Sequence, residues 1–312
     1  FTLDLNIPKP QNSISYRDKI FLIGSCFTEH IGNKLLDLKF DVRQNPHGIL
    51  FGVPAIYKAF QEYEERPQYS ASSLFLSNEI YYSWQHHSLF SGTNSDAVAE
   101  KINLSNAAAN DFLKESTWTI ITLGTSFSYY HIGEGMHVAN CHKVSQREFN
   151  KELLSIEAIK DYLQQTIARI RALNPLNKIV FTISPVRHIR DGVVENNRSK
   201  ARLIEVVHDL INGDDILYFP AYELVIDILR DYRYYDVDMV HPNYLATEFV
   251  MDRFIETYLD AETKTLSEEL KKISIAQKHR PQHPETRAHK EFLQDLELKI
   301  QGIKLKYPYV KF

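Results

Sequence analysis

Residues 19–28 read KIFLIGSCFT, and this stretch decides the fold. Its apolar part, Ile20 to Ile23, has the length of a buried strand and stops abruptly at Gly24 and Ser25. Thr28 is a candidate cap for the helix that follows. The apolar stripe of that helix has helical spacing and consists of Ile31, Leu35, Leu36 and Leu38. The stretch therefore predicts a strand, a tight turn at Ser25 and a helix.

Ser25 is a candidate nucleophile because of this position. Backbone N–H groups and the helix dipole point at the start of a helix and favour an oxygen that develops negative charge. In open α/β sheets, ligands bind at the carboxyl ends of the strands. The alternative is that Gly24 and Ser25 form only a turn.

Composition limits the class of protein. The 312 residues are 44% hydrophobic and 24% charged, which suffices for a large core, and the net charge of −4 argues against a nucleic-acid surface. No run is long enough for a transmembrane helix, and no secretory signal is visible, although the sequence starts at Phe1. Two cysteines, Cys26 and Cys141, are interpreted as free thiols and favour a cytoplasmic location.

Apolar strands alternate with amphipathic helices up to residue 260, after an extended arm over residues 1–18. This alternation predicts a three-layer α/β/α domain with a five-stranded, parallel, flavodoxin-like sheet. Two hairpins, within 74–84 and 129–141, interrupt it. Residues 261–312 are charged and predict a helical C-terminal extension, for which a role in a homodimer is one candidate. The predicted core strands lie at 20–23, 39–42, 118–123, 178–183 and 216–219, and the predicted helices at 54–63, 96–114, 155–173, 199–211, 223–229 and 244–258.

Asp238 and His241 form a second candidate site. A general-base histidine needs a nucleophile at one ring nitrogen and an orienting carboxylate at the other. One loop with Asp and His three residues apart can supply both the base and the carboxylate, and Pro242 stiffens that loop. Ser25, Asp238 and His241 are therefore predicted as a catalytic triad.

Ser25 and the Asp-x-x-His pair resemble the SGNH hydrolase superfamily. Gly24-Ser25-Cys26-Phe27 resembles the signature of the GSCFA family, with Thr28 where the family name has Ala. Further segments resemble blocks of the same family in the same order: NPHGIL (45–50), TLGT (122–125), NCHK (140–143), SPVRH (184–188) and DMVHP (238–242). The resemblance spans about residues 18–258 and implies an SGNH-like fold and a hydrolase, without naming a substrate.

The resemblance also implies an oxyanion hole. SGNH enzymes use the N–H of the serine, a glycine N–H after the second strand and an asparagine side chain after the third. The Ser25 N–H is expected to be available, and Gly48 matches the glycine. The third position departs from the pattern, because Thr125 stands where asparagine is expected. Either the Thr125 hydroxyl or the Asn45 amide is predicted to replace it.

The predicted activity is acyl transfer by Ser25, as an esterase acting on small acyl esters, including acetyl esters of carbohydrate. The alternatives are an acyltransferase with the same triad and a catalytically weak carbohydrate-binding module. No cofactor is predicted. No metal site is predicted either, because His131, His137, Cys141 and His142 lack the spacing of a zinc ligand set.

Other residues have two interpretations each. Cys26 is an alternative nucleophile, but the resemblance favours Ser25, with Cys26 packed in the core. Arg187 and His188, at a strand end, and His131 are candidate substrate ligands; Arg187 could instead pair with Asp236 or another carboxylate. His86 and His87 are expected at the surface. A group of aromatic residues is either a sugar-stacking platform or plain packing: Tyr81, Tyr82, Trp84, Tyr129 and Tyr130.

Overall fold

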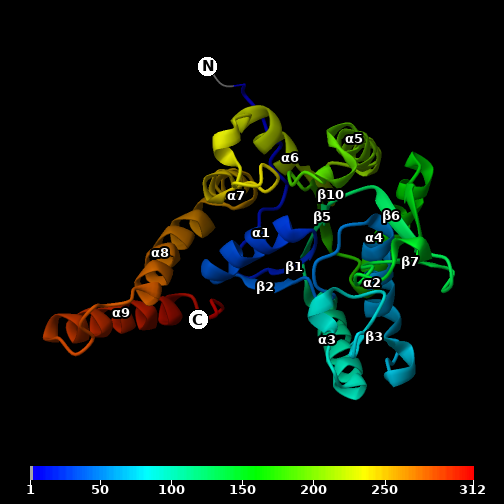
Figure 1. The fold of residues 1–312 in the computed structure, drawn as a ribbon. Coiled ribbons are helices and arrows are strands. Elements are labelled where there is room, and N and C mark those ends of the chain that lie inside the picture. Colours follow the sequence, from blue (N-terminus) through cyan, green and yellow to red (C-terminus); the bar gives the residue numbers. More distant parts are fainter. Residues whose placement is uncertain (1–2) are drawn as a thin grey trace.

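The computed structural model describes residues 3–312 and confirms the predicted parallel sheet (Figure 1). The strand order is β10-β9-β5-β1-β2, and every neighbouring pair is parallel. Numbered along the core, this is the flavodoxin-like order that was predicted. The strands are β1 (Lys19–Gly24), β2 (Asp41–Gln44), β5 (Trp118–Leu123), β9 (Lys178–Ile183) and β10 (Ile216–Phe219).

Helices cover both faces of this sheet because alternate strand residues point to opposite sides. Ile20 and Leu22 belong to a core with α1 (Cys26–Asp37) and α7 (Tyr244–Tyr258). Phe21 and Ile23 belong to the core on the other face. That second core contains apolar side chains of α2 (Val53–Glu65), α3 (Ser95–Glu115), α4 (Ile156–Leu173) and α5 (Val193–Leu210).

Two small antiparallel sheets lie outside the large one. The predicted hairpins are present as β3 (Phe75–Ser77) with β4 (Ile80–Tyr82), and as β6 (Phe127–His131) with β7 (Met136–Val138). A third strand, β8 (Phe149–Leu153), pairs with β6 and was not predicted. The short helical turns are 3₁₀ at Ala71–Ser73, Ser88–Phe90, Gln146–Glu148, Ile189–Asp191 and Tyr232–Tyr234, together with α6 (Ala221–Glu223) and a π-helical turn at Leu224–Leu229.

Three predicted boundaries were wrong. The second strand begins at Asp41 rather than residue 39, because Lys39 has a φ of 67° and cannot continue a strand. The fifth helix begins at Val193, six residues before the prediction, because Gly192 (φ 91°) starts it. The first helix is capped by Ser25 and not by Thr28, which is buried inside the helix.

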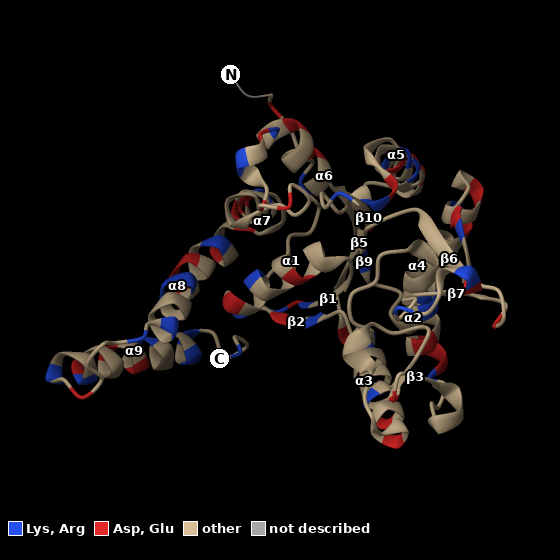
Figure 2. Cartoon of the chain, viewed as in Figure 1, with Lys and Arg blue, Asp and Glu red and all other residues tan. Residues whose placement is uncertain are grey.

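The C-terminal extension consists of two helices, α8 (Ala261–Lys278) and α9 (Arg287–Lys306), which project beside α7 (Figure 1). Leu266 and Leu270 of α8 belong to the same core as α1, and Lys278 pairs with Asp37 at 2.6 Å. Positively and negatively charged residues are interspersed along α8 and α9 (Figure 2). A separate domain boundary at residue 260 stays a prediction. None of the helices within residues 3–312 is long and apolar enough to cross a membrane.

Candidate active site

Ser25 ends β1 and caps α1. Its backbone is extended (φ −69°, ψ 175°), and its Oγ accepts the N–H of Phe27 at 3.3 Å. This is the ordinary N-cap geometry that favours serine. The side chain is fully buried, so the hydroxyl lies at the helix N-terminus without direct exposure to solvent.

Gly24 fixes the turn before Ser25. Its φ is 141°, and a Cβ atom there would lie 2.1 Å from the carbonyl oxygen of Thr122 on β5. Only glycine fits this close approach. The Gly24 N–H donates to Asn45 Oδ1 at 2.9 Å, so the loop after β2 holds the turn directly.

Asp238 and His241 are hydrogen-bonded to each other. Asp238 Oδ2 lies 2.6 Å from His241 Nδ1, and Asp238 Oδ1 accepts the N–H groups of Val240 and His241. These backbone and side-chain hydrogen bonds lower the pKa of the Asp238 carboxyl to about 2, so it stays ionised. The pair has the orientation that a general-base histidine and its carboxylate need.

The loop with Asp238 and His241 is docked on the carboxyl end of β9. The N–H of Arg187 donates to Val240 O at 3.2 Å, and its guanidinium donates to Met239 O at 3.3 Å. The guanidinium also lies over the Tyr235 ring, 4.2 Å from the centroid. Within residues 3–312 the guanidinium makes no ion pair, so the alternative interpretation, a salt bridge to Asp236 or another carboxylate, is wrong. Its role toward a substrate stays a prediction.

The two halves of the site come to the same edge of the sheet without touching. Burial lowers the pKa of both His30, in α1, and His188, after β9, and the charge of His241 lowers both further. The hydrogen bond from the Arg187 N–H to Val240 O places His241 near the end of β9. In the described part of the chain, however, no hydrogen bond joins Ser25 Oγ to His241. Catalytic hydrogen bonds of free enzymes are often long and tighten with substrate.

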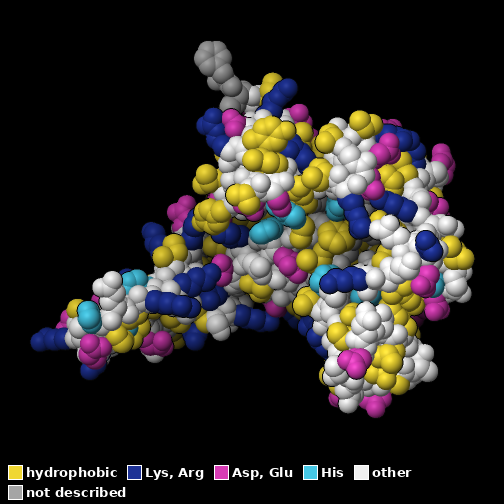
Figure 3. Space-filling model, viewed as in Figure 1, with side chains coloured by type: hydrophobic (Ala, Val, Ile, Leu, Met, Phe, Trp, Pro, Cys, Tyr) yellow, Lys and Arg dark blue, Asp and Glu magenta, His cyan; other side chains and the backbone are white. Residues whose placement is uncertain are grey.

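Figure 3 shows one face of the molecule with a hollow near its middle. Histidine side chains lie around this hollow, and hydrophobic side chains form part of its floor. The face is therefore concave and mixed in polarity, as small-molecule sites usually are.

The two backbone donors predicted for an oxyanion hole are already engaged. The Ser25 N–H donates to Thr122 O at 3.2 Å, so the expectation that it is free was wrong for this structure. The Gly48 N–H donates to Asn45 O at 2.7 Å, closing a tight turn in which Gly48 has a φ of 76°. His87 covers that turn, 2.3 Å from where a Cβ of residue 48 would lie.

Asn45 has the free donor. Its Oδ1 is fixed by Gly24, whereas its Nδ2 is buried and has no hydrogen-bond partner in residues 3–312. The Thr125 hydroxyl is instead part of an internal network, 3.0 Å from Ser199 Oγ and 3.1 Å from the N–H of Phe127. Of these two candidate side chains, Asn45 thus has a buried donor without a partner in residues 3–312, whereas the Thr125 hydroxyl is engaged.

Lys200 is a residue that sequence reasoning missed. It is 1% exposed, and its Nζ donates to Gly124 O at 2.6 Å and Ser184 O at 2.7 Å, at the ends of β5 and β9. Burial lowers its pKa from 10.5 to about 7. It has no carboxylate partner in the described chain. No signal in the sequence distinguishes it from other lysines of an amphipathic helix.

Cys26 is half-buried rather than packed in the core, and burial raises the pKa of its thiol. A raised pKa disfavours the reactive thiolate, which supports Ser25 over Cys26 as nucleophile. Both Cys26 and Cys141 are free thiols in the structure.

His188 and His131 occupy different surroundings. Burial lowers the pKa of His188 to about 4, and its ring lies edge-on to Phe51 with centroids 5.6 Å apart. His188 is thus a neutral imidazole near the site. His131 is 6% exposed between Trp84 and Phe149 in the small sheet, so its substrate contact stays a prediction without support from its position.

The aromatic residues of the hairpins pack mainly against each other. Trp84 is 9% exposed and stacks on Phe75 with centroids 3.7 Å apart. This favours plain packing for Trp84 over a sugar platform. Tyr129 is less buried and lines a cavity described below.

His86 is fully buried, so its predicted surface position was wrong. It forms a cluster with His47 and Glu62, whose ligand-type atoms lie within 4.8 Å of one another. His47 Nε2 lies 3.1 Å from Glu62 Oε2, Ser83 Oγ contacts His86 Nδ1, and Tyr69 donates to Glu62 Oε1.

The two imidazole rings of this cluster are stacked, with centroids 4.0 Å apart and planes 15° from parallel. In-plane lone pairs of stacked rings run side by side and do not converge on one ion. The His47–Glu62 hydrogen bond therefore indicates a structural role for the cluster, which supports the loop that contains Gly48.

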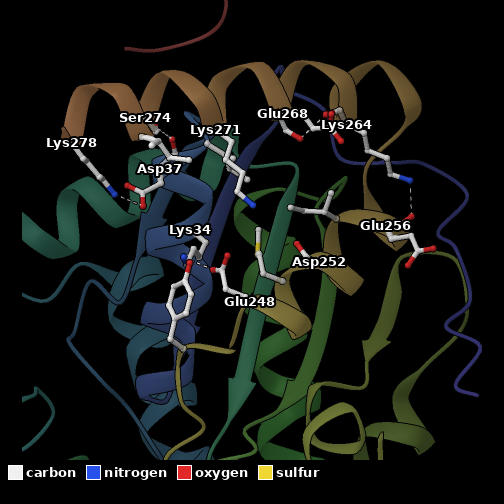
Figure 4. Close-up of a pocket in the computed structure, with 16 residues that line it drawn as sticks. Lys34, Asp37, Glu248, Asp252, Glu256, Lys264, Glu268, Lys271, Ser274 and Lys278 are labelled. Carbon is white, nitrogen blue, oxygen red and sulfur yellow. Dashed lines mark hydrogen bonds and ion pairs between the residues drawn. The ribbon is translucent and has the colours of Figure 1, made fainter. Parts of the chain in front are cut away.

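A cavity of about 450 Å³ lies away from these residues, between α1, α7 and α8 (Figure 4). Charged side chains make up much of its lining, and Lys34 pairs with Glu248 and Lys278 with Asp37. No group in it is placed for acyl transfer.

The parallel sheet with helices on both faces defines an α/β/α protein, in which Ser25 follows β1 and the loop with Asp238 and His241 is docked at the end of β9. The chain belongs to the GSCFA family: the family model matches residues 19–254, and the model of the GSCFA domain protein, C-terminal domain, matches residues 270–312. No curated protein matches it.

Three solved structures are similar to this chain. A carbohydrate esterase family 3 protein from Talaromyces cellulolyticus has 9% identity and a TM-score of 0.38, over 76% of this chain and 94% of that one. The family 3 carbohydrate esterase of Clostridium thermocellum has 10% identity and a TM-score of 0.35, over 77% and 94%. An acetyl xylan esterase from the rumen bacterium Butyrivibrio proteoclasticus has 12% identity and a TM-score of 0.35, over 81% and 64%.

Proposed function

We propose that this protein is a serine esterase that hydrolyses small acyl esters, with acetyl esters of carbohydrate as the substrate class. The observation that carries the proposal is the Asp238–His241 pair, which is hydrogen-bonded at 2.6 Å and held on the end of β9. Ser25 at the end of β1 supports it, because parallel strand ends share one edge of the sheet.

The proposed reaction has two steps. Ser25 Oγ attacks the ester carbonyl while His241 Nε2 takes its proton, and the same proton then goes to the leaving alcohol. In the second step, a water molecule that is deprotonated by His241 attacks the acyl carbonyl. The proton passes from His241 to Ser25 Oγ as the acyl–serine bond breaks and the acid leaves. Asp238 holds the imidazole by Nδ1 throughout and stabilises its protonated form.

Charge on the carbonyl oxygen needs a donor in both steps. The unpaired Asn45 Nδ2 is the proposed donor, since it is buried next to the Gly24–Ser25 turn. Removing a single donor of this kind typically lowers kcat by ~10²–10³.

Turnover of p-nitrophenyl acetate and of acetylated xylo-oligosaccharides, compared with a Ser25→Ala variant, tests the proposal. The expected result is release of acetate that disappears in the variant. Equal rates for both proteins would contradict it. Added acceptor alcohols distinguish hydrolysis from acyl transfer, because a transferase yields a new ester in place of free acetate.

A further inference from the structure

A cavity of about 700 Å³ adjoins the candidate site. Ile49 and Phe51, directly after the Gly48 turn, form one wall, and Phe51 contacts His188 edge-on. Its volume is in the range of small-molecule sites. Ser25 and His241 do not line the cavity; Ile49 and Phe51 connect it to the Gly48 turn and to His188.

The opposite wall includes a turn with an unusual backbone. Val144 N–H donates to Cys141 O at 2.9 Å, and both residues between them, His142 and Lys143, have positive φ values of 47° and 61°. This is the conformation of a type I′ turn, which normally selects Asn and Gly. Strained non-glycine residues of this kind concentrate at ligand-binding sites.

Neighbouring groups hold the turn in this conformation. His142 Nε2 lies 2.8 Å from Ser83 O, and the N–H of His142 donates to Asn140 Oδ1 at 2.9 Å. These hydrogen bonds fix the conformation of the turn. The turn belongs to residues 140–143, a segment that has no role in the proposed ester chemistry.

The Lys and Arg side chains that line the cavity give it a positive charge. Lys143 and Arg190 both line it, and its lining includes no Asp or Glu. Neither cation has an ion-pair partner within residues 3–312. Arg190 lines the cavity together with Cys141 and His142 of the turn.

We propose that this cavity binds an anionic sugar unit, with Lys143 and Arg190 on its carboxylate, sulfate or phosphate and Tyr129 and Phe149 against its ring. The proposal rests on the proposed esterase function, since it names the substrate class of the same site. Two unpaired cations on one cavity favour a negatively charged ligand, and a guanidinium suits oxyanions in particular. Aromatic side chains provide apolar faces for the ring.

Calorimetric titration of the Ser25→Ala protein tests this inference. The probes are methyl β-glucoside, methyl β-glucuronide, which differs only in its carboxylate, and the 6-sulfate and 6-phosphate of methyl β-glucoside. At least one anionic probe is expected to bind about tenfold more tightly than the neutral glucoside. Comparison of the three anions identifies which group the cavity accepts.

Lys143→Met and Arg190→Met are each expected to remove most of that preference. Lys114→Met, at an exposed position of α3, is the matched control and is expected to leave binding unchanged. Equal binding of neutral and anionic probes, or a preference that survives both substitutions in proteins with unchanged thermal unfolding, would overturn the inference. Because no turnover is measured, this result is independent of the p-nitrophenyl acetate assay, whose failure would overturn only the esterase.

Discussion

The two halves of the candidate site are built in opposite ways. The half with Asp238 and His241 is formed by one short loop, and both side chains are nearly half exposed, at 46% and 44%. The half with Ser25 is fully buried and depends on Asn45 and Thr122, which come from two other segments. A base that must turn toward substrate tolerates exposure, whereas a nucleophile and its oxyanion donor need fixed geometry.

This difference makes the two halves respond differently to mutation. Changes in the exposed loop are expected to alter function with little effect on stability, because exposed side chains contribute little to folding. Changes in the buried half are expected to affect both.

The largest expected effect on activity comes from removing Ser25 or His241, one residue from each half. Ser25→Ala and His241→Ala are each expected to lower kcat/KM by at least ~10⁴, and the double variant should lose hardly more, because the two residues act as one unit. Steady-state kinetics of all three variants measure this. Additive losses would show that the two residues do not form one catalytic unit.

Asn45 should have the next largest effect. Asn45→Ala is expected to lower kcat by ~10²–10³ through loss of the amide donor. Asn45→Asp is the matched control, since it keeps an acceptor for the Gly24 N–H but removes the donor, and it should be at least as inactive. Thr125→Val is expected to be nearly silent. A large loss of kcat in Thr125→Val together with normal activity in Asn45→Ala would assign the oxyanion donor to the Thr125 hydroxyl instead.

Lys200, in the buried half, should make the free energy of unfolding of the protein depend on pH. Its pKa falls from 10.5 to about 7 on folding, so the unfolded chain binds more protons between these values and stability rises with pH there. Between pH 7 and 9, a range below the titration of the tyrosines, Lys200 is expected to raise the free energy of unfolding by roughly 2 kcal/mol. This figure follows from ~1.4 kcal/mol per pH unit for one proton. Urea unfolding of wild type and Lys200→Met measures it.

The Lys200→Met variant should lack that part of the pH dependence, and Lys160→Met, on an exposed face, should retain it. The same change in the free energy of unfolding from pH 7 to 9 in the wild-type and Lys200→Met proteins would contradict the assignment.

Arg187 should have the smallest effect. It docks the exposed loop through Met239 O and the Tyr235 ring, and a cation–π contact at a partly exposed site contributes ~1 kcal/mol or less. Arg187→Leu is expected to lower the free energy of unfolding by about that amount, and kcat severalfold, because the loop becomes looser. Unchanged kcat would show that loop docking does not position His241.

The sequence was sufficient for the core strands and for the local half of the site. Strand periodicity and the alternation with helices predicted all five core strands, and the three-residue spacing of Asp238 and His241 predicted a pair within one loop. These features depend on neighbours along the chain, which a single sequence displays directly.

Features that depend on tertiary contacts could not be predicted in the same way. The Ser25 N–H is engaged because the register of β1 and β5 places Thr122 O beside it. In the Asn45 amide, the oxygen accepts the Gly24 N–H, and the nitrogen has no partner in the described residues. His86 is buried because the hairpin folds back onto His47 and Glu62. Lys200 gives no sign of its burial, since lysine on a helix is ordinarily exposed.

The central claim is that Ser25 is a nucleophile activated by His241. Labelling with a fluorophosphonate, followed by fragmentation of the tryptic peptide that spans residues 20–34, tests it directly. The account predicts one adduct on Ser25, absent in Ser25→Ala, much slower in His241→Ala and retained in Cys26→Ala. An adduct on Cys26, or no adduct in the wild-type protein, would contradict it.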